Sequence, residues 1–430
     1  MTLTWRAVLL VALGVPLVLV LPSGGTVLAW ALVCVALCVL DAALAASPRL
    51  VAVERDVPVS VRLTEPATST LTLTNVGTRR LRAVVRDAWP PSAAAEQDRH
   101  VVDVAPGDGA RARTVLRPER RGDALADRVT IRSSGPLGLA GRQASLTVPG
   151  RLRVLPEFAS RRHLPSRLAR LREMDGRAAV QVRGPGTEFD SLREYVIGDD
   201  VRAIDWRASA RRADVVVRTW RPERDRRVVI VLDTGRTSAV RVLDAPRLDA
   251  AIEAALLLSA LATRAGDRVE LVAFDRRVRA RVAGTAGPRL MPALADALAT
   301  TQPQLVETDW PGVVTQVRER LSQRALVVLL TALDASAVER GLLGVAGQLT
   351  ARHQVVLASV ADPEAESLRT ARGDAREVFD AAAAERGGLE RSAVAVRLRQ
   401  RGVEVVDALP DDLAPALADT YLALKAAGRL

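Results

Sequence analysis

The chain has 430 residues, of which 49% are hydrophobic and 3% aromatic, so it is long enough for two or three domains with sizeable cores. Its net charge of +11 does not indicate nucleic-acid binding, because the basic residues are almost all arginines interleaved with acids, and no basic helix face or set of stacking aromatics accompanies them. The two cysteines, Cys34 and Cys38, share one apolar segment, which excludes a disulfide scaffold and a cysteine-based zinc site.

Two apolar runs open the chain, at residues 7–22 and 26–46, with Ser-Gly-Gly between them. The second run is about long enough to cross a bilayer, and the first would need tilt or local thinning. A signal peptide is the alternative, but the basic start is weak, no clear cleavage site follows, and a second apolar run comes at once. We therefore predict a transmembrane helical hairpin over residues 1–47.

Positive charges flank the two ends of this hairpin. Arg6 precedes the first run, Arg49 and Arg55 follow the second, and the connecting loop carries no charge. The positive-inside rule then places both ends in the cytoplasm. We expect a cell-membrane protein with two spans, the lipid bilayer as one partner, and soluble domains on the cytoplasmic side.

The next two segments are predicted to be a β-domain and a linker. Residues 48–155 contain short runs of alternating apolar and polar residues, punctuated by Gly, Pro and Asp, which is typical of a small all-β sandwich-like domain. Residues 156–224 hold a linker and a charged motif. The basic helical stretch at 156–183 is interpreted as a solvated linker helix, and the alternative is a surface that meets anionic lipid.

Residues 225–430 alternate between strands and helices. This pattern predicts a C-terminal α/β domain with a doubly wound, mainly parallel sheet covered on both faces. Functional loops then belong at the carboxyl ends of the strands. Three loops stand out there by their hydroxyl and carboxylate residues: Asp233 to Ser238, Glu307 to Trp310, and Thr331 to Asp334. Oxygen ligands of this kind suit a hard cation such as Mg²⁺.

The three loops resemble the metal-ion-dependent adhesion site of von Willebrand factor A domains. The resemblance places the first acid at Asp233, a hydroxyl ligand at Thr237 and the second-loop threonine at Thr308. Two further positions lack their oxygen ligand, since they fall on glycine and alanine, and Asp334 comes two residues late. The expected site is therefore degenerate, with Asp233, Thr237, Thr308 and Asp334 as its residues. No cofactor is expected, and Mg²⁺ is the ion that these loops would suit. Helix capping and loop hydrogen bonds are the alternative role.

The charged segment at 186–212 and the run from Trp220 to Ser238 resemble the hallmark of the domain of unknown function 58 family. The resemblance extends over essentially the whole chain. It implies a membrane-tethered protein with a von Willebrand A type domain, whose genes often stand beside those of MoxR-type AAA+ ATPases. The activity of the family is not established, so the resemblance implies an architecture and a candidate partner, not a reaction.

The motif itself combines matched charges with aromatic residues, which predicts a buried polar network held by arginine–carboxylate pairs. Three roles are open: a clamp for the linker, a docking surface for a protein partner, or a catalytic centre. The residues selected for the first two roles are Arg193, Tyr195, Asp199, Asp200, Arg202, Asp205, Trp206, Arg211 and Glu223.

An enzyme is not expected, because the three histidines form no triad or metal spacing and the chain has neither a phosphate-binding P-loop nor a Gly-x-Ser-x-Gly motif. The predicted function is that of a membrane-anchored interaction or assembly factor whose partner is a MoxR-type ATPase. The rivals are a metal-dependent hydrolase at the membrane, with Asp199, Asp200, Asp205 and Asp233 gathering the metal, and a purely structural scaffold.

Overall fold

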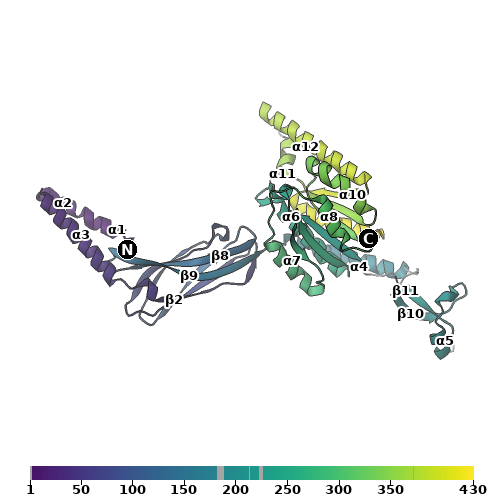
Figure 1. Cartoon of the computed structure of the whole chain (residues 1–430), viewed down its shortest axis with the longest axis horizontal. Helices are drawn as coiled ribbons and strands as arrows, with labels where there is room; N and C mark the ends of the chain where they lie inside the picture. The colour runs from purple at the N-terminus through teal and green to yellow at the C-terminus, as the bar shows by residue number, and fades with distance from the viewer. Residues whose placement is uncertain (1, 182–187, 213, 222–225, 371) are drawn as a thin grey trace. The chain divides into compact units, whose positions relative to one another are not determined.

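The computed structural model describes residues 2–181, 188–212, 214–221, 226–370 and 372–430. The chain divides into two compact units, Met1–Glu157 and Phe158–Leu430, and each is described by itself (Figure 1).

The first unit begins with apolar helices. They are α1 (Trp5–Ala12), α2 (Gly14–Val20) and α3 (Gly24–Leu44). Within the described residues, α3 is the one helix long and apolar enough to cross a membrane, by length and composition alone, and the segment Trp5–Val20 is shorter. A Cβ atom on Gly14 would lie 2.2 Å from Cδ1 of Trp30, so glycine allows the first helical segment to approach α3 closely. The predicted apolar helix is confirmed for α3, whereas a second span stays a prediction.

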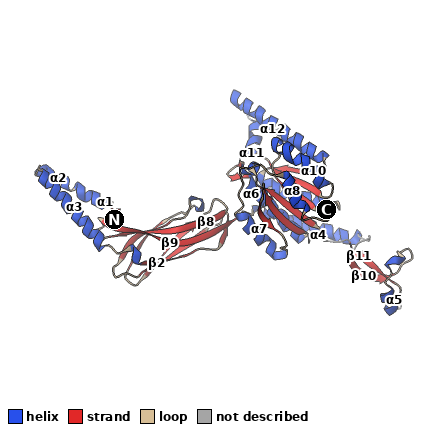
Figure 2. Cartoon of the chain, in the orientation of Figure 1, coloured by secondary structure: helices blue, strands red, loops and turns tan. Residues whose placement is uncertain are grey.

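Two antiparallel-rich sheets follow, which confirms a sheet-rich region after the apolar helices (Figure 2). Apolar residues alternate along their strands, and the buried ones from both sheets form a shared core that includes Leu71, Val85 and Ile131. The first sheet has the order β1 (Thr2–Leu3), β9 (Ala140–Leu155), β8 (Gly122–Ser134), β5 (Leu81–Asp87) and β6 (Arg99–Val104), with β3 (Ser60–Arg62) beside β9; the second is β2 (Val51–Asp56), β4 (Ala67–Asn75) and β7 (Gly109–Leu116). Short 3-10 turns lie at η1 (Pro48–Leu50) and η2 (Pro91–Ala93).

Asp41, near the end of α3, connects the apolar helices to the turn between β8 and β9 by hydrogen bonds. Its carboxylate is fully buried and accepts hydrogen bonds from the backbone N–H groups of Leu137, Leu139 and Ala140, at 2.7, 2.7 and 2.9 Å. The backbone N–H of Thr4 donates to the carbonyl of Leu139 at 3.0 Å. The start and the end of the apolar segment are therefore held by the same turn.

A six-stranded mixed sheet forms the centre of the second unit. Five strands are parallel, and the edge strand β16 is antiparallel to β15. The order of the strands reverses between β12 and β17, and in open α/β sheets ligands bind beside the carboxyl ends at such a point. The order is β16 (Val278–Val282), β15 (Arg268–Phe274), β12 (Arg227–Asp233), β17 (Leu326–Leu330), β18 (Gln354–Val360) and β19 (Val403–Ala408).

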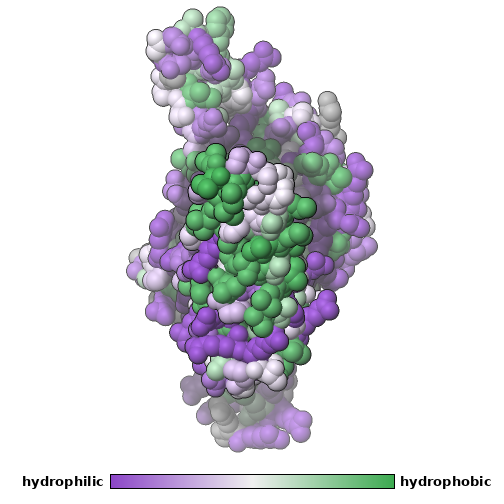
Figure 3. Space-filling model, turned by 90° about the vertical axis from the view of Figure 1, so that its left-hand side faces the viewer, coloured by the Kyte–Doolittle hydropathy of each residue, from purple (hydrophilic) through white to green (hydrophobic). Residues whose placement is uncertain are grey.

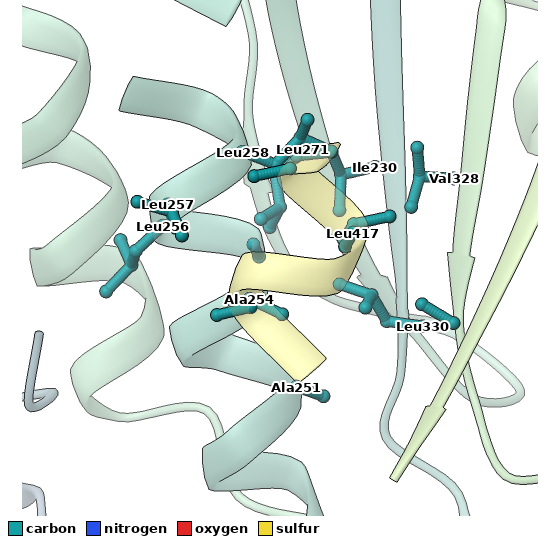
Figure 4. Close-up of a cluster of buried hydrophobic side chains, with 14 of the residues drawn as sticks. Ile230, Ala251, Ala254, Leu256, Leu257, Leu258, Leu271, Val328, Leu330 and Leu417 are labelled. Atoms are coloured by element: carbon teal, nitrogen blue, oxygen red, sulfur yellow. The ribbon is translucent and has the colours of Figure 1, made fainter. Parts of the chain in front are cut away.

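Helices cover both faces of this sheet because its strands are apolar on both sides. Ile230 faces a core with α6 (Arg247–Arg264), α7 (Leu290–Ala299) and α13 (Pro410–Ala426), where Leu257 and Leu417 pack (Figure 4). Val229 and Val231 face the opposite core, formed with α8 (Trp310–Arg318), α10 (Leu343–Thr350) and α12 (Ala375–Gln400). The remaining short elements around this sheet are η5 (Arg236–Ala239), β13 (Arg241–Val242), β14 (Ala245–Pro246), η6 (Gly287–Arg289), α9 (Ala335–Ala337), η7 (Val338–Leu342) and α11 (Pro363–Thr370).

The expected solvated linker helix is instead packed on the second unit. It begins after η3 (Ala159–His163) as α4 (Leu164–Gln181), and Leu171 is buried in the core around α6. Leu164, Leu168 and Leu171 follow the spacing of one helix face, which is the signal that the basic composition of this stretch obscured. Arg167 also pairs with Asp419 of α13 at 2.7 Å.

The charged motif folds as a small two-stranded module. Strand β10 (Glu188–Glu194) pairs antiparallel with β11 (Val216–Arg221), and η4 (Val201–Ala203) and α5 (Trp206–Arg212) lie between them in the chain. Val216 and Val217 of β11 are buried.

Candidate functional site

Asp233 ends strand β12, and its carboxylate collects hydrogen bonds from three loops. Oδ1 accepts from the hydroxyl of Thr308 at 2.5 Å and from the backbone N–H of Gly235 at 2.8 Å. Oδ2 accepts from the hydroxyls of Thr331 at 2.6 Å and Thr237 at 3.3 Å. A carboxylate has about four lone-pair positions, so these donors account for them. We call Asp233, Thr237, Thr308 and Thr331 the Asp233 cluster.

The Asp233 cluster is closed to solvent on most sides. Asp233 is only 3% exposed, and a cavity of about 10 Å³ beside it has the size of a single water or small ion. Burial raises the pKa of Asp233 above its ordinary value, and the hydrogen bonds from Thr308, Thr331, Gly235 and Thr237 oppose that rise. The chemistry of this site is therefore hydrogen bonding to one buried acid.

Gly235 determines how the first two loops meet. A Cβ atom at this position would lie 2.2 Å from the Thr308 hydroxyl oxygen and 3.0 Å from Oδ1 of Asp233. The backbone N–H of Arg236 donates to the carbonyl of Val306 at 2.8 Å. The glycine therefore creates the space that the Thr308 hydroxyl fills, and a serine in the manner of the adhesion site would collide with it.

Asp334 has a different task from the other three predicted metal residues. Its carboxylate caps α9, where Oδ1 accepts from the Ser336 hydroxyl at 2.7 Å and from the backbone N–H of Ala337 at 3.1 Å. The residue of the third loop that reaches Asp233 is Thr331, which follows β17 directly. Its place right after a buried strand is the sequence signal that could have selected it.

The donor set does not fit Mg²⁺ held as the adhesion-site resemblance implies. A hard cation prefers several oxygen ligands, usually with more than one carboxylate, and here one acid already receives four protein donors. Among the described residues, no group of three or more His, Cys, Asp or Glu side chains is arranged to hold a metal. The cluster as folded is a hydrogen-bonded junction of three loops.

Further polar residues near this edge were not predicted from the sequence. Asp275, after β15, has a fully buried side chain and accepts from Nε of Arg279 at 2.6 Å and from the hydroxyl of Thr234 at 3.2 Å. Burial would raise the pKa of Asp275, but Arg279 and two backbone N–H groups outweigh it and hold that pKa below its ordinary value. At the other side of the edge, Arg391 pairs with Asp407 at 2.6 Å.

The charged motif is organised by two acids. Asp199 is held by both terminal nitrogens of Arg193, at 2.7 and 2.6 Å. Asp205 accepts from the backbone N–H of Ala208 at 3.0 Å and from Nε of Arg218 at 2.8 Å. The hydrogen bond from Ala208 and then that from Arg218 lower the pKa of Asp205. Both acids therefore fix the turns of the module.

The expectation that this network is buried is wrong. The side chains of Arg193 and Asp199 are 44% and 22% exposed, and Trp206 is 68% exposed. A two-stranded sheet with one short helix has too little apolar surface to bury such groups, so the charges pair at the surface. Of the other selected residues, Asp200 accepts from the backbone N–H of Arg202, Tyr195 is half-buried, Arg211 is exposed, and Glu223 lies outside the described residues.

Comparison with known proteins gives a family match within the second unit. Residues 191–404 match the model of a family described as "Protein of unknown function DUF58". Uncharacterized proteins of Mycobacterium tuberculosis and Mycobacterium bovis are 26% identical over 185 residues, which is 42% of this chain and 57% of theirs. The match thus covers little more than half the length of these relatives.

Several solved structures are similar to about a quarter of the chain. The CARDB domain of a Pyrococcus furiosus protein matches 24% of this chain and 87% of its own, with 14% identity and a TM-score of 0.20. An alpha-2-macroglobulin fragment from Escherichia coli matches 26% of this chain and 18% of its own, with 19% identity and a TM-score of 0.21. Scores this low assign neither a fold nor a function.

Proposed function

We propose that this chain is a membrane-anchored, cytoplasm-facing interaction protein without catalytic activity, whose second unit is a von Willebrand A-like domain with a degenerate metal site. The partner that the family resemblance implies is a MoxR-type AAA+ ATPase. The observation that carries the proposal is the exposed apolar and basic surface of the charged module, for which we use the described residues 192–212 and 214–218.

Exposed apolar residues support docking through the charged module. Ile197 is 96% exposed, Trp206 68%, and Val201 62%. Arg207 and Arg211 of α5, the helix that begins with Trp206, are exposed as well. Tryptophan and arginine are the residues that most often dominate the energy of protein interfaces, and several large apolar side chains exposed in one short segment favour a contact surface.

The Asp233 cluster supports a scaffolding role at the sheet edge. Its four hydrogen bonds connect Gly235, Thr237, Thr308 and Thr331 to one buried acid and so hold three loops in fixed positions. Rigid loops at a strand-end edge suit recognition of a partner with little entropic cost on binding. We propose that Mg²⁺ is not required for this role.

The turn at residues 135–140 supports a hairpin with two spans. Thr4 and Asp41 both bind it, so the chain enters and leaves the apolar segment at one place. Because both ends of the segment lie at one place, they are on the same side of a bilayer, so the segment crosses the bilayer either twice or not at all. The flanking arginines favour the cytoplasm for both ends.

Neither rival receives comparable support. The hydrolase would need three of Asp199, Asp200, Asp205 and Asp233 around one metal, whereas two are paired with arginines and Asp233 with hydroxyls. The scaffold remains the second candidate. It predicts that Asp233→Ala and Arg211→Ala lower stability and leave partner recovery per folded molecule unchanged.

The test is affinity recovery of the tagged full chain from native membranes in the presence of ATP, with the bound AAA+ ATPase quantified by mass spectrometry. We expect near-stoichiometric recovery with the unmodified chain and a loss of about tenfold or more with Trp206→Ala, the effect of removing an interface anchor. Phe379→Ala on α12 is the matched control, because Phe379 is 77% exposed and lies outside the module. Absence of the ATPase with the unmodified chain, or equal loss in both variants, would contradict the proposal.

A further inference from the structure

Four arginines surround the place where the apolar helices join the β-sheets. Arg142 donates from Nε to the carbonyl of Ala42 at 2.9 Å and from Nη2 to that of Ala43 at 3.2 Å. Arg79 also donates to the carbonyl of Ala43. These two side chains therefore satisfy carbonyls at the C-terminal end of α3, where positive charge is favourable. Arg6 and Arg49 complete what we call the basal collar.

Arg6 and Arg49 lie at the two ends of the apolar segment. Nη1 of Arg6 lies 3.0 Å from the position that a Cβ on Gly138 would take, so it lies against the turn between β8 and β9. Arg49 follows α3 in η1 and is exposed. In the part of the chain that the structure describes, neither side chain caps a carbonyl, so their positive charges face solvent without a structural task.

The basal collar is not neutralised by neighbouring acids. None of its four arginines forms an ion pair within the described residues, whereas Arg80, just before β5, and Arg86, within it, pair with Asp103 and Asp98. Asp41, which lies among them, has both oxygens occupied by backbone N–H groups. The base of the helices therefore carries four arginines without an ion pair, and its one buried acid is closed off by backbone N–H groups.

The exposed apolar surface of the helices ends at the basal collar. Large apolar side chains are exposed along α1, α2 and α3, and Figure 3 shows hydrophobic residues gathered on the face that contains them. Leu137, at the tip of the turn that Asp41 holds, is 49% exposed as well. Helix α3 has 21 residues, which at 1.5 Å per residue is about 32 Å, close to the roughly 30 Å of a bilayer core.

We infer that the basal collar and the turn at residues 135–140 form a binding surface for anionic phospholipid headgroups. The inference rests on the proposed membrane hairpin. If α3 spans the hydrocarbon core, its C-terminal end places the collar at headgroup depth, with Leu137 among the upper acyl chains. Guanidinium groups bind phosphate oxygens in bidentate geometry, and an arginine close to an anionic surface is attracted to it.

The experiment uses the full chain in vesicles of phosphatidylcholine that contain spin-labelled phosphatidylglycerol or spin-labelled phosphatidylcholine. Electron paramagnetic resonance gives the fraction of each lipid that is immobilised at the protein. We expect phosphatidylglycerol to associate about two- to fivefold more strongly than phosphatidylcholine, with the preference falling at high salt. Arg6→Gln combined with Arg49→Gln should lower the preference clearly, because these two guanidinium groups cap no carbonyl and are free to bind phosphate, while the charges of Arg79 and Arg142 remain.

The matched control removes two charges at the other end of strand β9. Arg62 lies opposite Leu155 in the sheet, and Arg120 is exposed two residues before β8, which starts opposite Val154. Arg62→Gln combined with Arg120→Gln should keep the preference of the unmodified chain. Equal immobilisation of both lipids by the unmodified chain, or equal effects of the two double variants, would overturn the inference alone. No immobilised lipid of either kind would instead overturn the proposed membrane hairpin.

Discussion

The hydroxyl oxygen of Thr308 lies 2.5 Å from Oδ1 of Asp233, in the space that a side chain on Gly235 would need. A serine at 235 would restore the hydroxyl that the adhesion-site resemblance expects, but it would push against Thr308. A side chain at position 235 and the Thr308 hydroxyl would therefore occupy the same space, and in this chain the Thr308 hydroxyl occupies it.

Gly235→Ser should therefore destabilise the second unit by about 1–3 kcal/mol, the usual cost of overpacking a buried site. Hydrogen exchange of the slowest amides in β12 and β15 reports the free energy of unfolding of this unit. Gly344→Ser on α10 is the control, since a Cβ there meets no atom within 4 Å. Adding Thr308→Ala should recover most of the loss in Gly235→Ser, and a double variant as unstable as Gly235→Ser would place the conflict elsewhere.

Magnesium should not bind to the Asp233 cluster. A cation would have to displace hydroxyl and backbone donors from the carboxylate, and it would find one acid where strong sites supply more. Calorimetric titration of the full chain with Mg²⁺ or Mn²⁺ up to about 1 mM, a concentration at which weak protein sites for such cations fill, should show no saturable heat. Saturable binding that disappears in Asp233→Asn would contradict the hydrogen-bonded interpretation.

The order of strands and helices in the second unit followed from the sequence because continuous apolar strands alternate with amphipathic helices. The convergence of Asp233, Thr237 and Thr308 followed from the rule that loops meet at the carboxyl ends of parallel strands. The sequence did not predict that Thr331, and not Asp334, contacts Asp233. The two residues are three positions apart in one loop, and which of their side chains points inward depends on the folded loop. Burial of the charged motif was overestimated for a similar reason, since charge pairing alone does not reveal how much apolar surface surrounds it.

Asp41→Asn should loosen the turn between β8 and β9. The amide keeps one acceptor oxygen but directs a donor at backbone N–H groups, so some of the three N–H groups of Leu137, Leu139 and Ala140 lose their partner. Amide hydrogen exchange at these positions should quicken by about tenfold or more, which corresponds to a loss of about 1.4 kcal/mol. Asp56→Asn, an exposed acid in β2, should leave the exchange unchanged; equal effects of both variants would show that Asp41 does not hold the turn.

Arg279→Gln should destabilise the second unit in a manner that depends on pH. The variant leaves the buried carboxylate of Asp275 without its cation, which should cost about 3 kcal/mol at neutral pH. Because the folded pKa of Asp275 lies below its unfolded value, the ionised acid stabilises the fold above about pH 4, and this contribution is lost as the pH falls through the lower folded pKa. The difference in free energy of unfolding between the unmodified chain and Arg279→Gln should therefore narrow below about pH 4, as measured by hydrogen exchange of β15. Arg277→Gln is the control: Arg277 bonds to Asp275 through its backbone N–H and C=O, which the substitution keeps, so it should change stability by less than about 0.5 kcal/mol at either pH. A difference for Arg279→Gln that stays constant with pH would mean that Arg279 acts through packing and not through the charge of Asp275.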